Sequence, residues 1–388
     1  KGRPHLKLLR ELEAQISANL SNLIQGKNAL IFNTLSHNRF IDGQEIPSGG
    51  WALKEDKTKI LTDEDITTQY ERTFDESYKQ YELYEPFYQT SIPPNSHKGV
   101  TFKAQESTVE TPFFSVEFDE KTGAILHVFD QITKLDYLDG PSNIFELYED
   151  RSIQYPAWDI QLYHKEMPLE GPVFKSIDFK DGSVEVNYYI KRNDNDDKEN
   201  ECATTTIKQF ITFSSTEPVI DFRTLVNWTQ HDKLLKVAFN TNVRNRFARY
   251  GIQFGNLQRP THNNTMRDMA KFEVFGRWAD LSEQDRGVSL MSDVKCGFDI
   301  HETIMRMSLL KAPLQEDQWE DFGQRKFTYR AVFHNNTFSE AKIQDLHNEL
   351  ITPPVVCETS KQGEIKSDQS FVTISNHNIV LDTLKIAE

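Results

Sequence analysis

FFSVEFDEKTGAILHVFD, residues 113–130, is the stretch that decides the fold of this chain. Apolar and polar residues alternate on both sides of Asp119–Gly123, as in strands with one buried face and one solvated face. Gly123 supplies the left-handed backbone conformation that a tight hairpin turn requires. The stretch therefore predicts an antiparallel β-hairpin.

Long runs of the same kind follow this hairpin, and their regular spacing predicts two large antiparallel sheets packed face to face. The runs are 184–192 (VEVNYYIKR), 204–213 (TTTIKQFITF), 219–228 (VIDFRTLVNW) and 234–243 (LLKVAFNTNV). The acidic stretch 193–201 (NDNDDKENE) is expected to be a solvated hairpin loop rather than a metal site. The predicted fold class is mainly β.

The sequence on the N-terminal side predicts two further regions. Residues 1–26 are expected to form a helix left from a helical bundle, because Leu and Ile recur at spacings of three and four and Gly26 suits a C-terminal cap. Residues 27–107 are expected to form a small β-sandwich. Residues 63–90 within it are compatible with a helix or a long loop. Its predicted strands are 29–32, 39–41 and 51–53.

The large β-sandwich is assigned to residues 108–340, and 341–388 are expected to be a linker with returning strands. Within this last region, 341–356 are expected to be irregular and to end at Pro353-Pro354. The tail 370–388 alternates strongly and predicts a strand.

Composition narrows the classes of partner. The chain has 388 residues and a formal net charge of −15, which disfavours nucleic acid and anionic membrane surfaces. It has no apolar run long enough to span a membrane. Three distant cysteines without a CxxC pair favour reduced thiols and a cytoplasmic protein. A start without Met, in what reads as mid-helix, is expected of a piece of a longer polypeptide.

The densest group of polar residues lies in RYGIQFGNLQRPTHNNTMRDMAKFEVFGRWADLSEQDRGVSLMSDVKCGFDI, residues 249–300. Arg259 to Thr265 are expected to form a Pro-broken loop, and loops that hold polar groups beside a rigid scaffold tend to carry function. A strand-like run at 271–275 and a turn at Trp278-Ala279-Asp280 are expected to follow. These features alone do not name a reaction.

As a string, this segment resembles the C-terminal β domain of the α-mannosidases of glycoside hydrolase family 38, in the vacuolar, cytosolic and bacterial branch. The resemblance runs from about Ala29 to Ala387. It is strongest from Tyr148 to Lys311, which includes YEDRSIQYPAWDI (148–160) and MRMSLLKAP (305–313). It implies a galactose-mutarotase-like supersandwich in a parent enzyme that hydrolyses terminal α-linked mannose with retention.

The resemblance also implies that catalysis lies outside this chain. The family's nucleophile and its divalent metal, zinc, belong to an N-terminal (β/α) domain. This chain has no HExxH motif and no βαβ alternation, so we expect no catalytic residue and no metal here. The implied partners are a mannose-containing glycan and the missing N-terminal catalytic domain of the same polypeptide. A homo-oligomer is a further expectation, because related enzymes often assemble through β domains.

The candidate substrate-binding residues come from three family-like segments. Trp158 is expected to stack on a sugar face and Asp159 to accept hydroxyl hydrogen bonds, although a buried Trp beside a turn-capping Asp is an open alternative. Arg259, His262 and Asn264 are expected to reach a catalytic carboxylate or the sugar, or to order their own loop. The sixth candidate is Lys311.

Several positions depart from the family pattern. Lys311 stands where the family usually has Arg, and an ammonium cannot reproduce bidentate geometry. Lys271, Arg325 and Pro156 are further departures, which suggest altered substrate preference. A stand-alone carbohydrate-binding or scaffold module remains the rival interpretation, because such folds host many functions. A mutarotase-like epimerase would need a His/Glu acid–base pair, and no such pair is evident.

Overall fold

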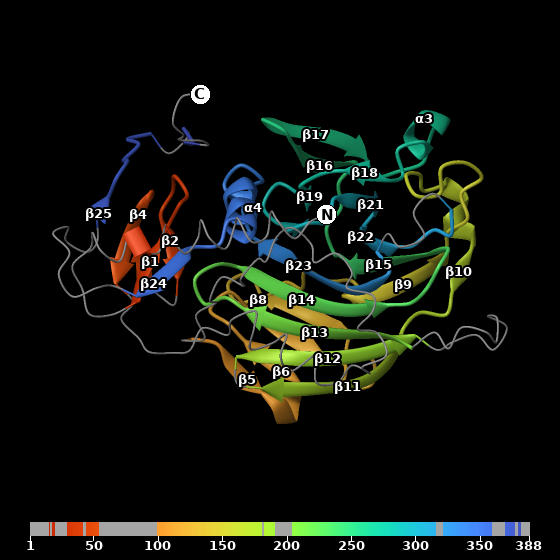
Figure 1. The fold of residues 1–388 in the computed structure, drawn as a ribbon, viewed down its shortest axis with the longest axis horizontal. Coiled ribbons are helices and arrows are strands. Elements are labelled where there is room, and N and C mark those ends of the chain that lie inside the picture. Colours follow the sequence, from red (N-terminus) through yellow and green to blue (C-terminus); the bar gives the residue numbers. More distant parts are fainter. Residues whose placement is uncertain are drawn as a thin grey trace. The chain divides into compact units, whose positions relative to one another are not determined.

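In the computed structural model, about half of the described residues form antiparallel β-strands (Figure 1). The described residues are 15, 18–19, 29–41, 44–53, 99–180, 182–190, 204–315, 321–358, 369–376 and 379–381. They fall into two compact units, 1–98 with 348–388, and 99–347. The mainly β fold class is confirmed. No helix in the described part of the chain is long and apolar enough to cross a membrane.

The first unit is built on a small sheet that joins distant parts of the sequence. Strand β1 (Ala29–Phe32) pairs with β24 (Val355–Glu358) on one side and β4 (Gly50–Leu53) on the other, and β4 pairs with β25 (Gln369–Ser370). Beside this sheet, β2 (Arg39–Ile41) and β3 (Gln44–Ile46) form a hairpin. The strands predicted at 29–32, 39–41 and 51–53 are therefore confirmed.

The second unit begins with a four-stranded sheet around the hairpin predicted at 113–130. Its strands are β5 (Thr101–Lys103), β6 (Thr108–Glu110), β7 (Phe114–Phe118) and β8 (Ile125–Asp130), with η2 (Ala104–Glu106) between β5 and β6. Gly123 has φ +72°, and a Cβ there would lie 2.5 Å from Val186 Cγ1. The turn therefore needs glycine for its backbone conformation and for space.

Two larger antiparallel sheets form the body of this unit. The nine-stranded sheet runs in the order β11 (Val173–Lys180), β12 (Ser183–Ile190), β13 (Thr205–Phe213), β14 (Val219–Trp228), β23 (Gly323–His334), β20 (Gly287–Ser292), β19 (Trp278–Ser282), β16 (Phe247–Ile252), β17 (Gly255–Pro260). The six-stranded sheet runs in the order β10 (Pro168–Leu169), β9 (Ile144–Glu149), β15 (Lys233–Asn240), β22 (Ile304–Lys311), β21 (Gly297–His301), β18 (Val274–Phe275). The runs predicted at 184–192, 204–213, 219–228 and 234–243 correspond to β12, β13, β14 and β15, whereas β11, β22 and β23 were not predicted.

The main hydrophobic core lies between these sheets. Phe222 of β14 and Phe239 of β15 meet edge to face at 5.7 Å, and Phe222 also stacks on Tyr329 of β23 at 4.8 Å. All three side chains are fully buried. Tyr329 donates its hydroxyl hydrogen to Asn143 Oδ1 at 2.5 Å, so the polar tip of the ring is satisfied inside the core. Apolar packing across the two sheets therefore closes the sandwich.

Several expectations for element type are wrong. Residues 341–356 contain helix α4 (Ile343–Ile351), whose buried Ile343, Leu346 and Leu350 follow helical spacing. Residues 278–282 form strand β19 rather than a turn, with Trp278 and Asp280 both buried.

The tail differs from its prediction too, because β25 stops at Ser370 and neither 371–376 nor 379–381 is a strand. Other predictions fall on parts of the chain outside the described residues. These parts include most of the helix 1–26, the segment 63–90 and the acidic loop 193–201. The domain boundaries drawn from the sequence stay predictions.

Candidate functional site

Two segments of the second unit carry five of the six candidate residues, and the sixth, Lys311, ends β22. We name residues 150–167 the Trp158 segment and residues 259–275 the Arg259 segment. The first follows β9, and the second begins at the end of β17. Figure 1 shows α3 (Met266–Met269) of the Arg259 segment and the yellow Trp158 segment at the same end of the unit.

The Trp158 segment presents two aromatic rings to solvent. Trp158 is 76% exposed and Tyr155 is 58% exposed, and their ring centroids lie 5.7 Å apart at 33°. A tight turn holds them together, because the backbone N–H groups of Trp158 and Asp159 both donate to Tyr155 O at 2.9 Å. Tyr155 itself has a positive φ of 55°. The open alternative of a buried Trp does not describe this side chain.

Lys311, at the end of β22, anchors the base of this turn. Its Nζ lies 2.8 Å from Asp150 Oδ2 and donates to Asp159 O at 2.6 Å. The Lys311 side chain is largely buried and Asp150 is almost fully buried. The structure therefore brings Trp158, Asp159 and Lys311 together, and the Lys311 ammonium already has partners within the chain.

The Arg259 segment begins on a strand rather than in a loop. Arg259 lies in β17, so the loop expected at 259–265 starts only at Thr261, which is a correction to the sequence reading. Thr261 is buried and donates through Oγ1 to Asn245 O at 2.6 Å. Thr265 caps α3 by accepting from Asp268 N at 3.2 Å. Thr261 and Thr265 therefore fix both ends of the loop.

The remaining candidates of this segment are accessible from solvent to different degrees. Arg259 is half-buried and donates only to the neighbouring Gln258 O, at 3.3 Å, among the hydrogen bonds of the described residues. His262 is half-buried, with Nδ1 3.6 Å from Asp268 Oδ2. Asn264 is exposed. An arginine fork, an imidazole and an amide on one short stretch can recognise a carboxylate and sugar hydroxyls.

A buried network of charged residues lies between the two segments. It was not predicted from the sequence. Lys236 of β15 is fully buried, with Nζ 2.7 Å from Glu273 Oε2 and 3.5 Å from Asp299 Oδ2. Asp299 also pairs with Lys165 at 2.8 Å. Burial alone would lower the pKa of Lys236, but Glu273 and Asp299 raise it above its ordinary value. Lys236 is therefore charged inside the protein.

The same network shapes the pKa of its carboxylate. Burial alone would raise the pKa of Asp299, but Lys236 and Lys165 hold it below its ordinary value. His164, next to Lys165, is buried against the rings of Tyr148 and Phe272. Burial and then the charge of Lys236 lower the pKa of His164. The imidazole is therefore neutral near pH 7, which suits a residue packed between aromatic rings.

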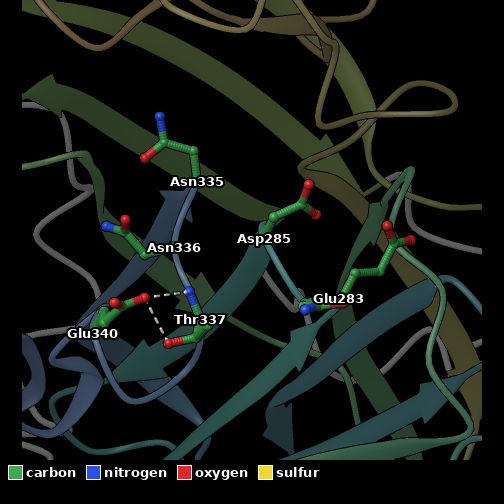
Figure 2. A pocket seen from close by; sticks show the side chains of 7 residues that line it. Glu283, Asp285, Asn335, Asn336, Thr337 and Glu340 are labelled. Carbon is green, nitrogen blue, oxygen red and sulfur yellow. Dashed lines mark hydrogen bonds between the residues drawn. The ribbon is translucent and has the colours of Figure 1, made fainter.

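An open pocket of about 590 Å³ lies away from these residues (Figure 2). It is lined by Glu283, Gln284, Asp285, Asn335, Asn336, Thr337 and Glu340, and by none of the six candidates. Two of its carboxylates have structural partners. Glu283 accepts from Arg244 N at 2.8 Å, and Glu340 accepts from the Thr337 hydroxyl at 2.8 Å. Within the described residues, no group of three His, Cys, Asp or Glu side chains could hold a metal ion.

Comparisons with known proteins identify the family of this chain. The family model described as the glycosyl hydrolases family 38 C-terminal domain matches residues 109–319, more than half of the chain. Human alpha-mannosidase 2C1 is 33% identical over 251 residues, which cover 63% of this chain and 23% of that protein. The alpha-mannosidase of Saccharomyces cerevisiae is 35% identical over 248 residues, covering 59% and 22%. The chain thus spans less than a quarter of the length of these relatives.

A solved structure supports the same fold. The crystal structure of an alpha-mannosidase from Enterococcus faecalis matches with a TM-score of 0.56 and 13% identity, covering 70% of this chain and 34% of that one. At this identity the match shows the fold alone. Both segments and Lys311 lie within residues 109–319, the part of the chain that the family model covers.

Proposed function

The chain belongs to the C-terminal domain family of the glycosyl hydrolases of family 38. We therefore propose that it is the non-catalytic β region of an α-mannosidase. The parent enzyme would hydrolyse terminal α-linked mannose with retention, through two carboxylates and a zinc ion on an N-terminal part of the polypeptide. The described residues offer no fitting donor set for that ion, so we assign it no place on this chain. The observation that carries the proposal is the pair of ligand-accessible segments fixed at one end of the β-sandwich.

Each candidate side chain has a role that its geometry can support. Trp158 and Tyr155 offer an apolar platform on which the C–H face of a pyranose can stack. Asp159 can accept hydroxyl hydrogen bonds beside that platform. Arg259 can pair with a carboxylate of the catalytic part, and His262 and Asn264 can reach the sugar. Lys311 holds the backbone of Asp159 and positions this group.

The chain would therefore complete one wall of the sugar pocket and pack against the catalytic part. We propose a cytoplasmic location for the parent enzyme, for which the unpaired Cys296 is a supporting observation. On its own, the 45.1 kDa chain should not hydrolyse an aryl α-mannoside. Clear turnover by the purified chain would contradict the proposal.

The first experiment is an immunoblot of source-cell extract with an antibody against this chain. A band far above 45.1 kDa supports a larger enzyme. In that enzyme, Trp158→Ala should raise KM for an aryl α-mannoside by roughly two- to twelvefold, which corresponds to about 0.5–1.5 kcal/mol for a lost aromatic contact. An unchanged KM would remove the Trp158 segment from the sugar site.

A band at 45.1 kDa would instead favour a stand-alone carbohydrate-binding module. The exposed Tyr155–Trp158 pair is the observation that supports this second candidate, because adjacent solvent-facing rings are suited to sugar stacking without a catalytic partner. Titration of the isolated chain with mannose oligosaccharides, followed by tryptophan fluorescence, distinguishes the two. Saturable binding that Trp158→Ala abolishes favours the module.

A further inference from the structure

We propose that Lys236 is a positioning residue that fixes the Trp158 segment and the Arg259 segment relative to each other. Both segments would then present their ligand-binding side chains as one surface. The identity of the ligand rests on the proposed function. The coupling between the segments does not, because it follows from contacts within the chain.

The position of Lys236 in β15 forces its ammonium onto the outer face of the six-stranded sheet. Its neighbours Leu235 and Val237 belong to the hydrophobic core, and successive side chains of a strand point to opposite faces. The Lys236 side chain is 0% exposed, so its charge must be balanced by protein groups rather than by water. Segments folded over this face provide part of that balance.

Glu273 provides the link to the Arg259 segment. Its Oε2 lies 2.7 Å from Lys236 Nζ, and its Oε1 accepts from Ser308 Oγ at 2.5 Å. The backbone opposite leaves room for this carboxylate, because a Cβ at Gly297 would lie 2.7 Å from Glu273 Oε1. Both oxygens are therefore held, and the end of the Arg259 segment is fixed on the sheet.

Asp299 provides the link to the Trp158 segment. One oxygen lies 3.5 Å from Lys236 Nζ and the other accepts from Lys165 Nζ at 2.8 Å. Lys165 also lies 5.7 Å from the ring centroid of Phe272, and the ring of His164 lies 6.0 Å from the same ring. Lys165 and His164 thus contact the Arg259 segment directly while Asp299 ties them to Lys236.

The same sheet face contains a matched control. Arg306 of β22 pairs with Glu146 of β9 through Nε at 2.7 Å and Nη2 at 3.3 Å, with both side chains mostly buried. Both residues lie on strands, and among the ion pairs of the described residues neither reaches the Trp158 or the Arg259 segment. Loss of Arg306 breaks an ion pair on this face that does not bridge the two segments. Arg306 lies opposite Asp299 in the sheet and acts on Asp299 and Lys236 through its charge alone, so its loss should affect the segments less than loss of Lys236.

Hydrogen exchange on the chain tests the coupling. The amides to follow are His164 and Met167 in one segment and Ala270 and Lys271 in the other, all with intact backbone hydrogen bonds. Lys236→Met should speed exchange at both pairs by roughly tenfold or more, while amides of β13 and β14 keep their rates. Arg306→Met should speed exchange at both pairs clearly less than Lys236→Met does, because Arg306 acts on Asp299 and Lys236 only through its charge.

Lys165→Met refines this test, because it removes the ion pair with Asp299 and the contact with Phe272 but leaves the Lys236–Glu273 pair intact. Acceleration of one segment alone by Lys236→Met, or equal acceleration of both segments by Arg306→Met, would overturn the proposal. If Lys236→Met does not fold, the cycle of Lys165→Met and Glu273→Gln replaces it. The combined fold-change should then fall below the product of the two single fold-changes, since both act on one chain of ion pairs; a plain product would overturn the coupling.

Kinetics on the native polypeptide that contains this chain separate the two proposals. Lys236→Met should raise KM for an aryl α-mannoside severalfold more than it lowers kcat, because misplaced segments weaken binding first. If Trp158→Ala raises KM and Lys236→Met does not, the positioning role is wrong and the proposed function stands. If neither changes KM, the proposed function itself fails.

Discussion

The interior between the two large sheets and the outer face of the six-stranded sheet are built in opposite ways. The interior is apolar and aromatic, with Phe222 of one sheet against Phe239 of the other. The outer face carries Lys236, Asp299 and Arg306 on adjacent strands, under segments that exclude water. One sandwich therefore uses two kinds of contact on the two sides of a single sheet.

This difference separates stability from position. A fully buried aromatic side chain contributes about 1.5–3 kcal/mol through burial alone. A buried ion pair often contributes little net stability compared with apolar residues of the same volume, but it requires its partners in defined places. The interior therefore supplies most of the stability, and the charged face determines where the candidate segments lie.

The interior should show the largest effect. Phe222→Ala removes a ring that packs on both Phe239 and Tyr329, and should lower the free energy of unfolding by about 3–5 kcal/mol. Urea denaturation followed by circular dichroism measures this loss. Phe222→Leu, which keeps most of the volume, should cost less than half as much. A loss below 1 kcal/mol for Phe222→Ala would mean that the interior is not the source of stability.

The charged face should show a smaller loss of stability and a larger local change. Lys236→Met leaves Glu273 with Ser308 and Asp299 with Lys165, so we expect a loss of about 3 kcal/mol, the low end for breaking a buried pair. The same denaturation experiment measures it. Replacing Lys236, Glu273 and Asp299 together by apolar residues should recover much of the lost stability. A triple variant less stable than Lys236→Met would show that the charged face, and not only the interior, supplies stability.

A pH titration sharpens the comparison at helix α4. Burial, and then the charge of Arg277, lower the pKa of His347 to about 4. Between about pH 6.5 and pH 4, His347 is protonated in the unfolded chain but not in the folded chain. The free energy of unfolding therefore falls as pH falls through this window. The loss should approach about 3 kcal/mol at pH 4. His347→Leu should be less sensitive to acid over the same window; equal sensitivity would exclude His347 as the cause.

Trp158 should have the smallest effect on stability. Its side chain is 76% exposed, so Trp158→Ala should change the free energy of unfolding by less than about 0.5 kcal/mol. Thermal denaturation measures this, with Trp278→Ala as a buried counterpart that should cost about 3–5 kcal/mol. A large loss for Trp158→Ala would show that the platform is structural.

Several strands could be predicted from the sequence because their signal is local. Alternation in 113–130 reports the buried faces of β7 and β8 without knowledge of their partners. β14 and β19 are buried along all or nearly all of their length and show no alternation of burial; the long run 219–228 was still predicted as a strand, whereas the short segment 278–282 was not. Helix α4 was missed although its spacing was present, because the following Pro353-Pro354 suggested an irregular region.

The candidate site could be predicted only in part. Trp158 and Asp159 were predicted from one motif and Lys311 from another, and the structure joins the two motifs through the Lys311 ammonium. Lys236 could not be found, since a lysine in an apolar strand gives no sign of its distant partners Glu273 and Asp299. A network of buried charges depends on contacts between residues that are distant in the sequence, and these cannot be predicted from a single sequence.

The pairing of β1 with β24 sets an order for biosynthesis. Phe32 pairs with Val355, so about 320 residues separate two neighbouring strands of one small sheet. At about 5–20 residues per second, the ribosome needs roughly 15–60 s to make the intervening chain. The continuous second unit can fold during that time, while the edge of β1 that pairs with β24 stays unpaired. Nascent chains of this protein should therefore depend on a chaperone for that edge and not for the large β-sandwich.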